Sequence, residues 1–383
     1  MATLKDLRRT SGATRCLECG KCSTLCPLSS FRNFSVARMA AIHDPGTDLV
    51  AHGAMINRCL TCGACEIRCP QGVHFTTFVR GLRAEMPQSC RDRCPHGAAL
   101  EGAARLTTRL PSAGRDLTWI TPDLRISDRG EVALFVGCLP LFDIMFEDEL
   151  GIRTIEIARS AIRLLNAAGI EPVIVEDERC CGHDLLWNGE HDAFRALATA
   201  NAAAFEARGV KHIVSTCGEC SRTLKLDYPD AVPGYRPKIE HISELVAREI
   251  DSGKLKFDGD GARVTFQDSC RLSRHMGVVD APRQVLAAAG GELTEMEHRG
   301  ADARCCGTAG FIHCDSDSRR MQEQRLEEAM ATGAETLLTA CPKCWIHFAC
   351  ATHEDHVRER VRGTIQVEDL TVFAARRLTG GLS

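Results

Sequence analysis

The chain has 383 residues, enough for two or three domains, and its formal net charge is −4. This small negative charge argues against nucleic acid or an anionic membrane as the main partner. The 22 cysteines lie at metal-binding spacings in a long chain, which favours metal clusters over the disulfides of a small secreted protein. The first residues lack the apolar run of a signal peptide, and no stretch approaches the roughly 20 apolar residues of a spanning helix. We therefore expect a cytoplasmic protein without direct membrane insertion, associated with a membrane only through a partner subunit.

Two cysteine runs open the chain. Residues 16–26 read C-x2-C-x2-C-x3-C before a proline, and residues 59–69 repeat the pattern. In bacterial ferredoxins three close thiolates of such a run hold one 4Fe–4S cube, and the fourth cysteine ligates the cube of the other run. Zinc sites are the weaker alternative, because they use two C-x-x-C pairs without a Cys-Pro ending. The predicted ligands are Cys16, Cys19, Cys22 and Cys69 for cluster 1, and Cys59, Cys62, Cys65 and Cys26 for cluster 2.

Apolar spacing predicts short helices over residues 31–43 and 74–86, so we expect a helical two-cluster ferredoxin domain over residues 1–86. Residues 87–130 contain several prolines and little periodicity, which is typical of a linker. Cys90 and Cys94 lie in this segment as half of a cluster motif without partners, and we interpret them as ordinary thiols.

From residue 131 the pattern alternates strands with helices, and it does so twice. The first copy predicts strands at 132–136, 172–175 and 212–215, with helices at 154–168 and 192–208. The second copy predicts strands at 263–266, 292–296 and 336–339, with helices at 281–289 and 318–331. A repeat of this length indicates a duplication. We predict an α/β fold with two such units, residues 131–255 and 256–383, related by a pseudo-two-fold axis.

Each copy carries a lone cysteine, a Cys-Cys-Gly and a C-x-x-C, close to the ends of predicted strands. Ligands of open parallel sheets bind at the carboxyl ends of strands, so the ten thiols should meet in a cleft between the two halves. A cube needs only four ligands. Five thiols therefore predict a cube with a spare reactive thiol, or an unusual cluster with more ligand positions. Two zinc sites would leave some thiols idle.

The doubled pattern resembles the catalytic module of heterodisulfide reductases, and the ferredoxin runs on the same chain resemble their fused D-type subunit. The resemblance covers residues 16–344. It implies two non-cubane 4Fe–4S clusters that face each other across a cavity, where a disulfide is reductively cleaved. The implied ligands are Cys138, Cys180, Cys181, Cys217 and Cys220 for cluster 3, and Cys270, Cys305, Cys306, Cys341 and Cys344 for cluster 4.

The resemblance implies an oxidoreductase subunit acting on a sulfur group, with clusters 1 and 2 feeding electrons to clusters 3 and 4. Cys181 and Cys306 are then cluster-borne catalytic candidates. Protons must follow the electrons, and the candidate donors are His183, His275 and Lys343. Arg271 and Arg274 are candidates for holding an anionic substrate, and Cys314 and Cys350 belong to neither motif.

No G-x-G-x-x-G after a strand and no Walker loop occurs in the sequence, so we expect the electron donor to be a flavoprotein, a ferredoxin or a membrane cytochrome. The architecture is also similar to the iron–sulfur subunits of glycolate oxidase and anaerobic glycerol-3-phosphate dehydrogenase. That similarity implies a relay from a flavin subunit towards quinone. A subunit of an electron-bifurcating complex is a third interpretation. The two complete five-cysteine sets favour disulfide chemistry.

Overall fold

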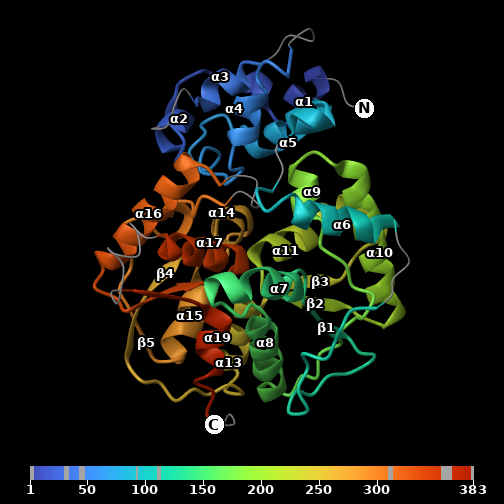
Figure 1. Ribbon diagram of the computed structural model, residues 1–383, viewed down its shortest axis with the longest axis vertical. Coiled ribbons are helices and arrows are strands. Elements are labelled where there is room, and N and C mark those ends of the chain that lie inside the picture. The colour runs from blue at the N-terminus through green and yellow to red at the C-terminus, as the bar shows by residue number, and fades with distance from the viewer. Residues whose placement is uncertain are drawn as a thin grey trace.

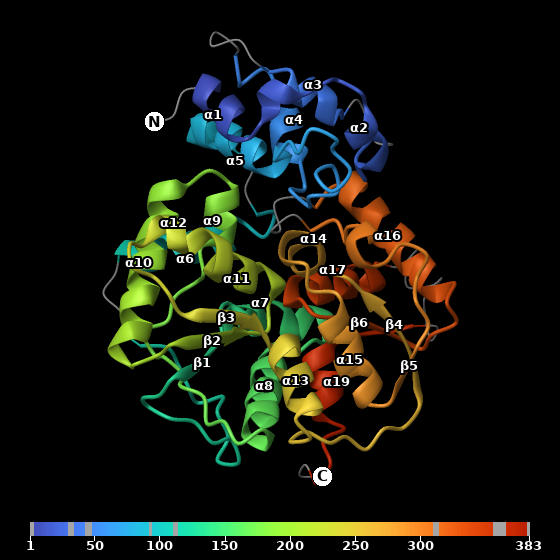
Figure 2. The ribbon, with the colours of Figure 1, turned by 180° about the vertical axis from the view of Figure 1, so that it is seen from behind.

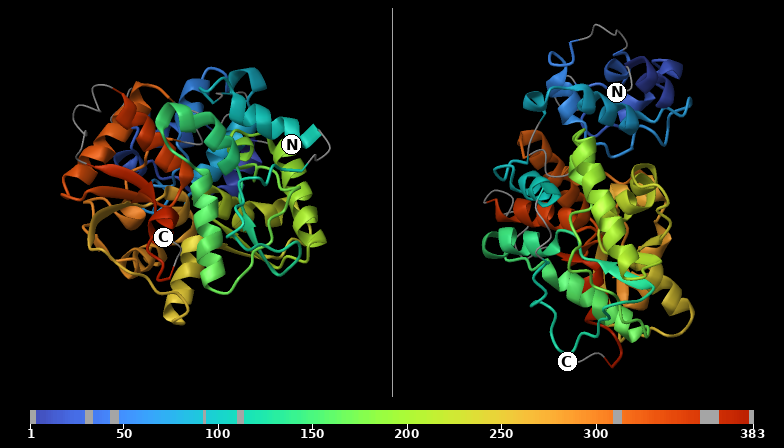
Figure 3. Two further views of the ribbon diagram at one scale, coloured as in Figure 1. Left: turned by 60° about the horizontal axis from the view of Figure 1, so that its bottom comes forward. Right: turned by 90° about the vertical axis from the view of Figure 1, so that its right-hand side faces the viewer.

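The computed structural model describes residues 4–29, 34–42, 48–91, 94–109, 114–308, 314–354 and 365–380. An N-terminal helical domain, blue in Figure 1, lies across one end of two α/β halves, which are green to yellow and orange to red. The side view of Figure 3 places this domain at the end of the molecule opposite the C-terminus. Among the described residues, no helix is long and apolar enough to cross a membrane.

Short helices form the N-terminal domain, as the spacing predicted. They are α1 (Leu4–Thr10), α2 (Lys21–Leu25), α3 (Val36–Ala40), α4 (Gly53–Arg58) and α5 (Phe75–Glu85), with a 3-10 turn at Ala13–Arg15. Residues 31–33 and 43 of the first expected helix lie outside the described residues. The core consists of side chains such as Met39, Ile56 and Phe78, all of them fully buried. These apolar side chains hold the two cysteine runs against one another.

The segment expected to be a linker contains a regular helix. After a 3-10 turn at Gln88–Cys90, helix α6 spans Ala99–Arg109 and buries Leu100 and Ala104. It lies on the first half, against α9 (His183–Trp187) and α10 (His191–Ala207). This segment is therefore part of the packed structure of the first half.

Three parallel strands form the sheet of the first half, in the order β1 (Val132–Phe135), β2 (His212–Ser215) and β3 (Lys238–His241). Val132 pairs with His212, and His212 pairs with Lys238. The strand expected at 172–175 is absent as a regular element, and Val173 instead makes isolated parallel bridges to Ser127 and Ala133. The helices besides α9 and α10 are α7 (Leu139–Leu150), α8 (Ile155–Ala167), α11 (Gly218–Arg222), α12 (Tyr228–Ala231) and α13 (Ile242–Asp251), with a π-helix at Thr223–Asp227.

The second half has four parallel strands in the order β5 (Gly291–Leu293), β4 (Ala262–Gln267), β6 (Thr336–Thr339) and β7 (Gln366–Asp369). Val264 of β4 pairs with Thr336, and Thr336 pairs with Gln366. The helices are α14 (Cys270–Met276), α15 (Asp280–Ala288), α16 (Ser316–Met330), α17 (Pro342–His353) and α19 (Leu370–Ala375), with a 3-10 turn at Gly300–Asp302. The pattern predicted β4, α15, α16 and β6 to within two residues, but it missed α14 and placed the strand of β5 at residues 292–296.

The two halves match element by element. Strands β1, β2 and β3 take the places of β4, β6 and β7, and Val173 lies beside β1 as β5 lies beside β4. Helix α13 packs on α15, and the corresponding helix α19 packs on α8. Figure 2 shows these four helices between the two sheets. One continuous apolar core runs through them, so the duplication folds as a single body with pseudo-two-fold symmetry.

Candidate iron–sulfur sites

The lone cysteines and the C-x-x-C motifs lie just after the carboxyl ends of strands. Cys138 precedes α7 after β1, and Cys217 precedes α11 after β2. In the second half, Cys270 begins α14 after β4, and Cys341 precedes α17 after β6. Because all these strands are parallel, their carboxyl ends point to one edge of each sheet. The backbone topology therefore brings each five-cysteine set to one place.

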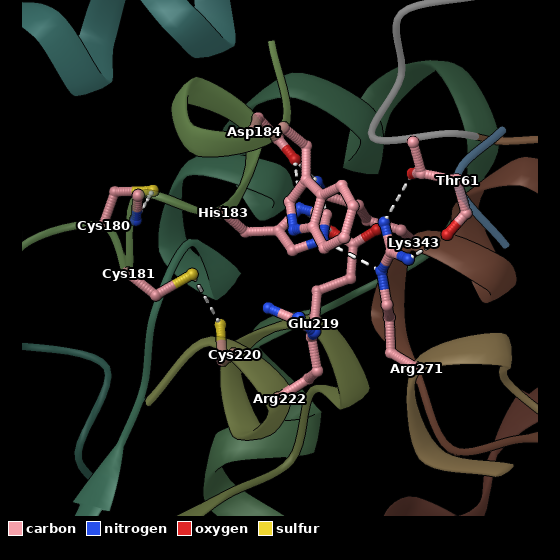
Figure 4. A network of polar contacts seen from close by, with 12 residues as sticks. Thr61, Cys180, Cys181, His183, Asp184, Glu219, Cys220, Arg222, Arg271 and Lys343 are labelled. Carbon is pink, nitrogen blue, oxygen red and sulfur yellow. Dashed lines mark hydrogen bonds and ion pairs between the residues drawn. The ribbon is translucent and has the colours of Figure 1, made fainter. Parts of the chain in front are cut away.

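The thiols of the first set form a connected group. Cys180 lies close enough to Cys138 and Cys181 for both to lower its pKa, and the Cys220 Sγ lies 3.4 Å from the Cys181 Sγ. Cys217 in turn hydrogen bonds to Cys220. All five line one small cavity, together with His183, Asp184, Glu219 and Lys343. Figure 4 shows Cys180, Cys181 and Cys220 to one side of His183 and Glu219. A compact set of thiol donors around a cavity fits a thiolate-bound iron–sulfur cluster.

The second set repeats this arrangement. Cys305 lies close enough to Cys270 and Cys306 for both to raise its pKa, and the Cys344 Sγ lies 3.3 Å from the Cys306 Sγ. Cys341 hydrogen bonds to Cys344. The donor chemistry again fits a cluster held by thiolates.

Two further contacts join the sets to one another. Cys217 of the first set lies close enough to Cys341 of the second for each thiol to shift the pKa of the other. Cys305 of the second set lies beside Cys62 of the ferredoxin domain, and this proximity lowers the pKa of Cys62 to about 5. The thiols thus form a line that runs from the second ferredoxin run, through the second set, to the first set.

One thiol of the first ferredoxin run lies with three thiols of the second run. A mostly buried cavity is lined by Cys26 of the first run and by Cys59, Cys62 and Cys65 of the second. These four are the ligands predicted for cluster 2. Among the ligands predicted for cluster 1, Cys16 and Cys22 lie near one another, whereas Cys19 is exposed. The Cys69 Sγ accepts a hydrogen bond from the Val73 N–H at 3.4 Å. The place of Cys69 in cluster 1 stays a prediction.

Glycines make the Cys-Cys turns possible. Gly182 and Gly307 have φ values of 81° and 91°, in the left-handed region that favours glycine. A Cβ on Gly182 would lie 2.8 Å from the Phe194 ring, and one on Gly307 would lie 3.0 Å from the Ser318 carbonyl oxygen. Any residue other than glycine at position 182 or 307 would therefore have a strained backbone and a Cβ too close to its neighbours.

A buried side chain holds the backbone of each Cys-Cys turn. The Tyr228 hydroxyl donates to the Cys181 carbonyl oxygen at 3.2 Å, and the His347 Nδ1 lies 2.8 Å from the Cys306 carbonyl oxygen. No pattern in the sequence pointed to Tyr228 or His347 as a residue of these sites. Tyr228 follows the π-helix and His347 lies inside α17, so they stand at unequal distances from their C-x-x-C motifs and no repeat marks them.

A buried ionic network lies between the two halves (Figure 4). The Lys343 Nζ, from the second C-x-x-C, lies 2.6 Å from carboxylate oxygens of both Asp184 and Glu219 in the first half. Burial opposes the charge of Lys343, but the two carboxylates outweigh it and raise its pKa well above the usual range. The His183 Nδ1 is 2.8 Å from Asp184 and 3.2 Å from Glu219. Lys343 therefore fills, as a cation, the space among three groups that could otherwise ligate a metal ion.

Arg271 connects the network to the ferredoxin domain. Its Nε donates to the His183 Nε2 at 3.1 Å, and its Nη2 donates to the Thr61 hydroxyl at 2.8 Å. Its Nη1 donates to the Thr61 carbonyl oxygen and lies 3.0 Å from the His275 Nε2. Burial lowers the pKa of both His183 and His275 well below the usual range. Both histidines are therefore neutral and accept hydrogen bonds from Arg271.

Arg274 also binds protein backbone. Its Nε donates to the Cys62 carbonyl oxygen at 2.7 Å, and its Nη1 donates to the Ala303 carbonyl oxygen at 2.6 Å. The two arginines that the sequence suggested for an anionic substrate thus hold the loop of the second ferredoxin run. The sequence did not point to Asp184, Glu219 or Trp187 as site residues. The ring centroid of Trp187 lies 4.3 Å from the Arg271 guanidinium. A signal for Glu219 was present, because Glu219 and Lys343 are oppositely charged inner residues of the two C-x-x-C motifs.

Comparison with known proteins matches residues 12–73 to the 4Fe-4S dicluster domain, and residues 132–225 and 264–349 each to the cysteine-rich domain. The D-type subunit of the dihydromethanophenazine:CoB–CoM heterodisulfide reductase of Methanosarcina acetivorans is 32% identical over 70% of this chain and 63% of its own length. The EtfAB:quinone oxidoreductase of Syntrophomonas wolfei is 28% identical over 63% of this chain and 32% of its own length. One subunit of the fumarate reductase (CoM/CoB) of Methanothermobacter marburgensis is 28% identical over 62% of this chain and 45% of its own length. The chain thus spans less than two thirds of each of these relatives.

Proposed function

Because the chain belongs to the iron–sulfur oxidoreductases that join a 4Fe-4S dicluster domain to two cysteine-rich domains, we propose that it reductively cleaves a disulfide as one subunit of a complex. In this proposal electrons pass through clusters 1 and 2 to cluster 4 and then to cluster 3. The substrate class comes from the heterodisulfide reductase relatives, and the electron path comes from the order of the thiols.

The observation that carries the proposal is the unbroken line of thiols. Cys62 lies beside Cys305, and Cys341 lies beside Cys217, so the three thiol groups of the line adjoin one another. A protein that only stored electrons would not need two complete five-cysteine sets in contact. The adjoining pair of sets suits a two-electron reaction that is supplied one electron at a time.

Cleavage of a disulfide takes two electrons and two protons and yields two thiols. When bound, clusters 3 and 4 would supply the electrons. The chain places the Lys343 ammonium group on the wall of the first-set cavity, where it would offset part of the negative charge of the thiolates and of Asp184 and Glu219. His183 and His275 orient Arg271 by accepting its hydrogen bonds. We assign the charge-stabilising role to Lys343 and positioning roles to the two histidines.

The electron donor would dock at the ferredoxin domain. Cys19 is exposed, and the neighbouring Leu17 side chain is 65% exposed, so the first run lies at the surface at the start of the path. A flavoprotein, a ferredoxin or a membrane cytochrome would fill this role, because the sequence has no nucleotide-binding motif of its own.

A relay function is the second candidate. In it the same path would carry electrons from a flavoprotein to quinone or another acceptor, with no disulfide involved. The specific observation in its favour is that two thiols of the first set, Cys138 and Cys180, are only partly buried at the far end of the line.

Metal analysis of anaerobically purified protein, with EPR spectroscopy, tests the proposal. We expect four clusters and about sixteen irons. Cys181→Ala and Cys306→Ala should each abolish disulfide reduction while the signals of clusters 1 and 2 persist. Cys350→Ala, a thiol outside all four sets, is the matched control and should keep full turnover. About eight irons with zinc, or normal turnover in both cluster variants, would contradict disulfide cleavage.

A further inference from the structure

The duplicated halves carry different charges at corresponding positions beside their thiols. The third residue of the C-x-x-C motif is Glu219 in the first half and Lys343 in the second. Four residues after the lone cysteine, the first half has the apolar Phe142, whereas the second half has Arg274. The two five-cysteine sets therefore share their pattern of thiols but not their electrostatic surroundings.

The first set faces an excess of negative charge. Asp184 and Glu219 line its cavity, and the Lys343 Nζ lies 2.6 Å from both carboxylates. His183 contacts the same carboxylates but is neutral, because burial lowers its pKa well below the usual range. Two carboxylates thus share one cation on this side of the set. On the other side, the pocket of about 360 Å³ beside Cys138 and Cys180 has charged lining residues that balance, and these are Arg115, Arg179, Glu176 and Glu178.

The second set faces an excess of positive charge, which Arg274 carries. This residue follows Cys270 on α14, and its guanidinium donates to the carbonyl oxygens of Cys62 and Ala303. Burial opposes the charge of Arg274, but attraction to the thiolates of Cys62, Cys270 and Cys305 outweighs burial and raises the pKa of the guanidinium. A cleft of about 700 Å³ reaches Cys305, and the charged residues of its lining are Arg68, Arg274 and Arg304 against Glu297 and Asp302.

Two further charged side chains do not reverse this difference. Arg271 donates to both His183 and Thr61, so its charge lies between the sets and favours neither. Asp369 lies near Cys341 of the second set, where burial raises the pKa of its carboxyl to about 7. Asp369 therefore carries only part of a negative charge at neutral pH.

The charge around an iron–sulfur cluster is one of the factors that set its reduction potential. An added electron makes the cluster and its thiolates more negative, so a nearby cation favours reduction and a nearby carboxylate opposes it. These effects are strong where burial keeps water from screening the charges. Two clusters of the same type would therefore differ in potential at the two sets.

We propose that this difference in charge makes the second set the place where a single electron rests, and the first set the stronger reductant of the pair. Arg274 stabilises the added negative charge at the second set, whereas Asp184 and Glu219 oppose it at the first. The inference rests on the cluster ligands of the proposed function, and it holds whether the electrons go to a disulfide or pass to another acceptor.

The electron balance needs only the donor already named. The donor at the ferredoxin domain gives up one electron for each set that is reduced, and no bond forms or breaks. The first electron stays at the second set, beside Cys62 of the ferredoxin domain, and the first set is reduced by the second electron. The pair thus collects two electrons before it acts as a strong reductant.

A redox titration of the anaerobic holoprotein, followed by EPR with no disulfide present, measures the order of reduction. The signals lost in Cys306→Ala and in Cys181→Ala identify the second and the first set. We expect an electron to prefer the second set at least tenfold, which is about 59 mV for a one-electron couple. Equal potentials of the two sets, or earlier reduction of the first set, would overturn the proposal.

Substitutions of Arg274 test the cause of this order. Arg274→Gln removes the charge but keeps a hydrogen-bond donor, and it should lower the preference for the second set about tenfold. Arg274→Lys keeps the charge and should keep the order of the wild type. Arg68→Gln is the matched control, because Arg68 lines the same cleft but its side chain is 56% exposed, so water and salt screen its charge.

Asp184→Asn tests the first set from the opposite direction. It leaves Lys343 with one carboxylate, so the potential of the first set should rise and the preference should again fall about tenfold. This variant decides the question even if Arg274→Gln loses iron. Equal shifts in Arg274→Gln and Arg68→Gln, or an unchanged preference in Asp184→Asn, would overturn the proposal. A protein that keeps the order of reduction but cleaves no disulfide would contradict disulfide cleavage alone.

Discussion

At the scale of single residues, Lys343 and Glu219 decide how the two halves meet. Each is the third residue of its C-x-x-C motif, and their charged atoms lie 2.6 Å apart. The side chains are only 6% and 8% exposed, so neither charge is solvated by water. Removal of one partner from such a buried pair leaves the other charge uncompensated, which costs more than the pair itself contributes.

We predict that Lys343→Met lowers the free energy of unfolding of the holoprotein by about 3–5 kcal/mol. The double variant Lys343→Met with Glu219→Gln should recover part of this loss, because it removes one of the two stranded carboxylates. Urea unfolding followed by circular dichroism measures both. Lys238→Met is the control, since Lys238 is 55% exposed in its ion pair with Glu240, and it should cost less than about 1 kcal/mol. Equal losses in Lys343→Met and the control would show that the buried network does not stabilise the halves.

The sequence predicted the thiol groups but not their neighbours. Cysteine spacing is local, so it marked out the five thiols that the fold gathers in each set, whereas their roles as cluster ligands, including that of Cys26, stay predictions. Thr61 and Trp187 became neighbours of Arg271 only through packing of three segments far apart in the chain. No periodicity or motif records such contacts.

At the scale of elements, the duplicated halves end their last strands with different helix caps. His241 is the last residue of β3 and caps α13, where its Nδ1 accepts the Ser243 N–H at 3.2 Å. Asp369, the last residue of β7, caps α19 by accepting the Thr371 N–H at 2.8 Å. A neutral imidazole can accept this bond, whereas a protonated one cannot. Burial accordingly lowers the pKa of His241 to about 4.

This cap predicts a dependence of stability on pH. The folded state keeps His241 neutral down to about pH 4, whereas the unfolded chain protonates near its ordinary pKa of 6.5. The unfolded state therefore binds more protons between these values, and stability falls as the pH drops below 6.5. Between pH 7.5 and pH 5.5 we expect a loss of about 1 kcal/mol from this residue.

His241→Asn isolates the effect, because the amide oxygen keeps a cap acceptor that does not titrate. Urea unfolding of wild type and variant at the two pH values gives the difference. The variant should lose about 1 kcal/mol less than the wild type over this interval. Parallel losses in both proteins would assign the acid sensitivity to other groups.

Several elements depend on tertiary partners, so the sequence predicted them wrongly or not at all. Residues 172–175 have the composition of a strand, but Pro172 lacks an N–H and the segment forms only bridges beside β1. Strand β3 carries Lys238 and Glu240, and Glu240 is held by His212 and Arg248 from neighbouring elements. Helix α6 lies among prolines, which hid its amphipathic spacing. The strands that were predicted, such as β2 and β6, are buried apolar runs next to cysteines.

At the scale of the whole molecule, one side chain connects all three parts. Arg271 belongs to the second half, bonds His183 of the first half, and bonds Thr61 in the loop of the second ferredoxin run. The sequence predicted three units but not their order of contact. Only the packed structure brings Cys62 to Cys305, and so makes the second five-cysteine set the neighbour of the ferredoxin domain.

We therefore predict that Arg271→Met loosens the ferredoxin domain without unfolding either half. Loss of the Arg271 guanidinium removes two charge-assisted hydrogen bonds to Thr61, each worth about 1.5–3 kcal/mol. The substitution also relieves repulsion between Arg271 and Arg222, because the pKa of Arg222 is lowered first by burial and then by Arg271. Hydrogen exchange of residues 53–63 should become about tenfold faster or more, and electrons given to the ferredoxin domain should reach the second set more slowly in freeze-quench EPR. Arg68→Ala is the control, because the Arg68–Asp302 pair spans the same interface with both side chains more than half exposed. Faster exchange in the control, or unchanged exchange in Arg271→Met, would show that Arg271 does not hold the domains together.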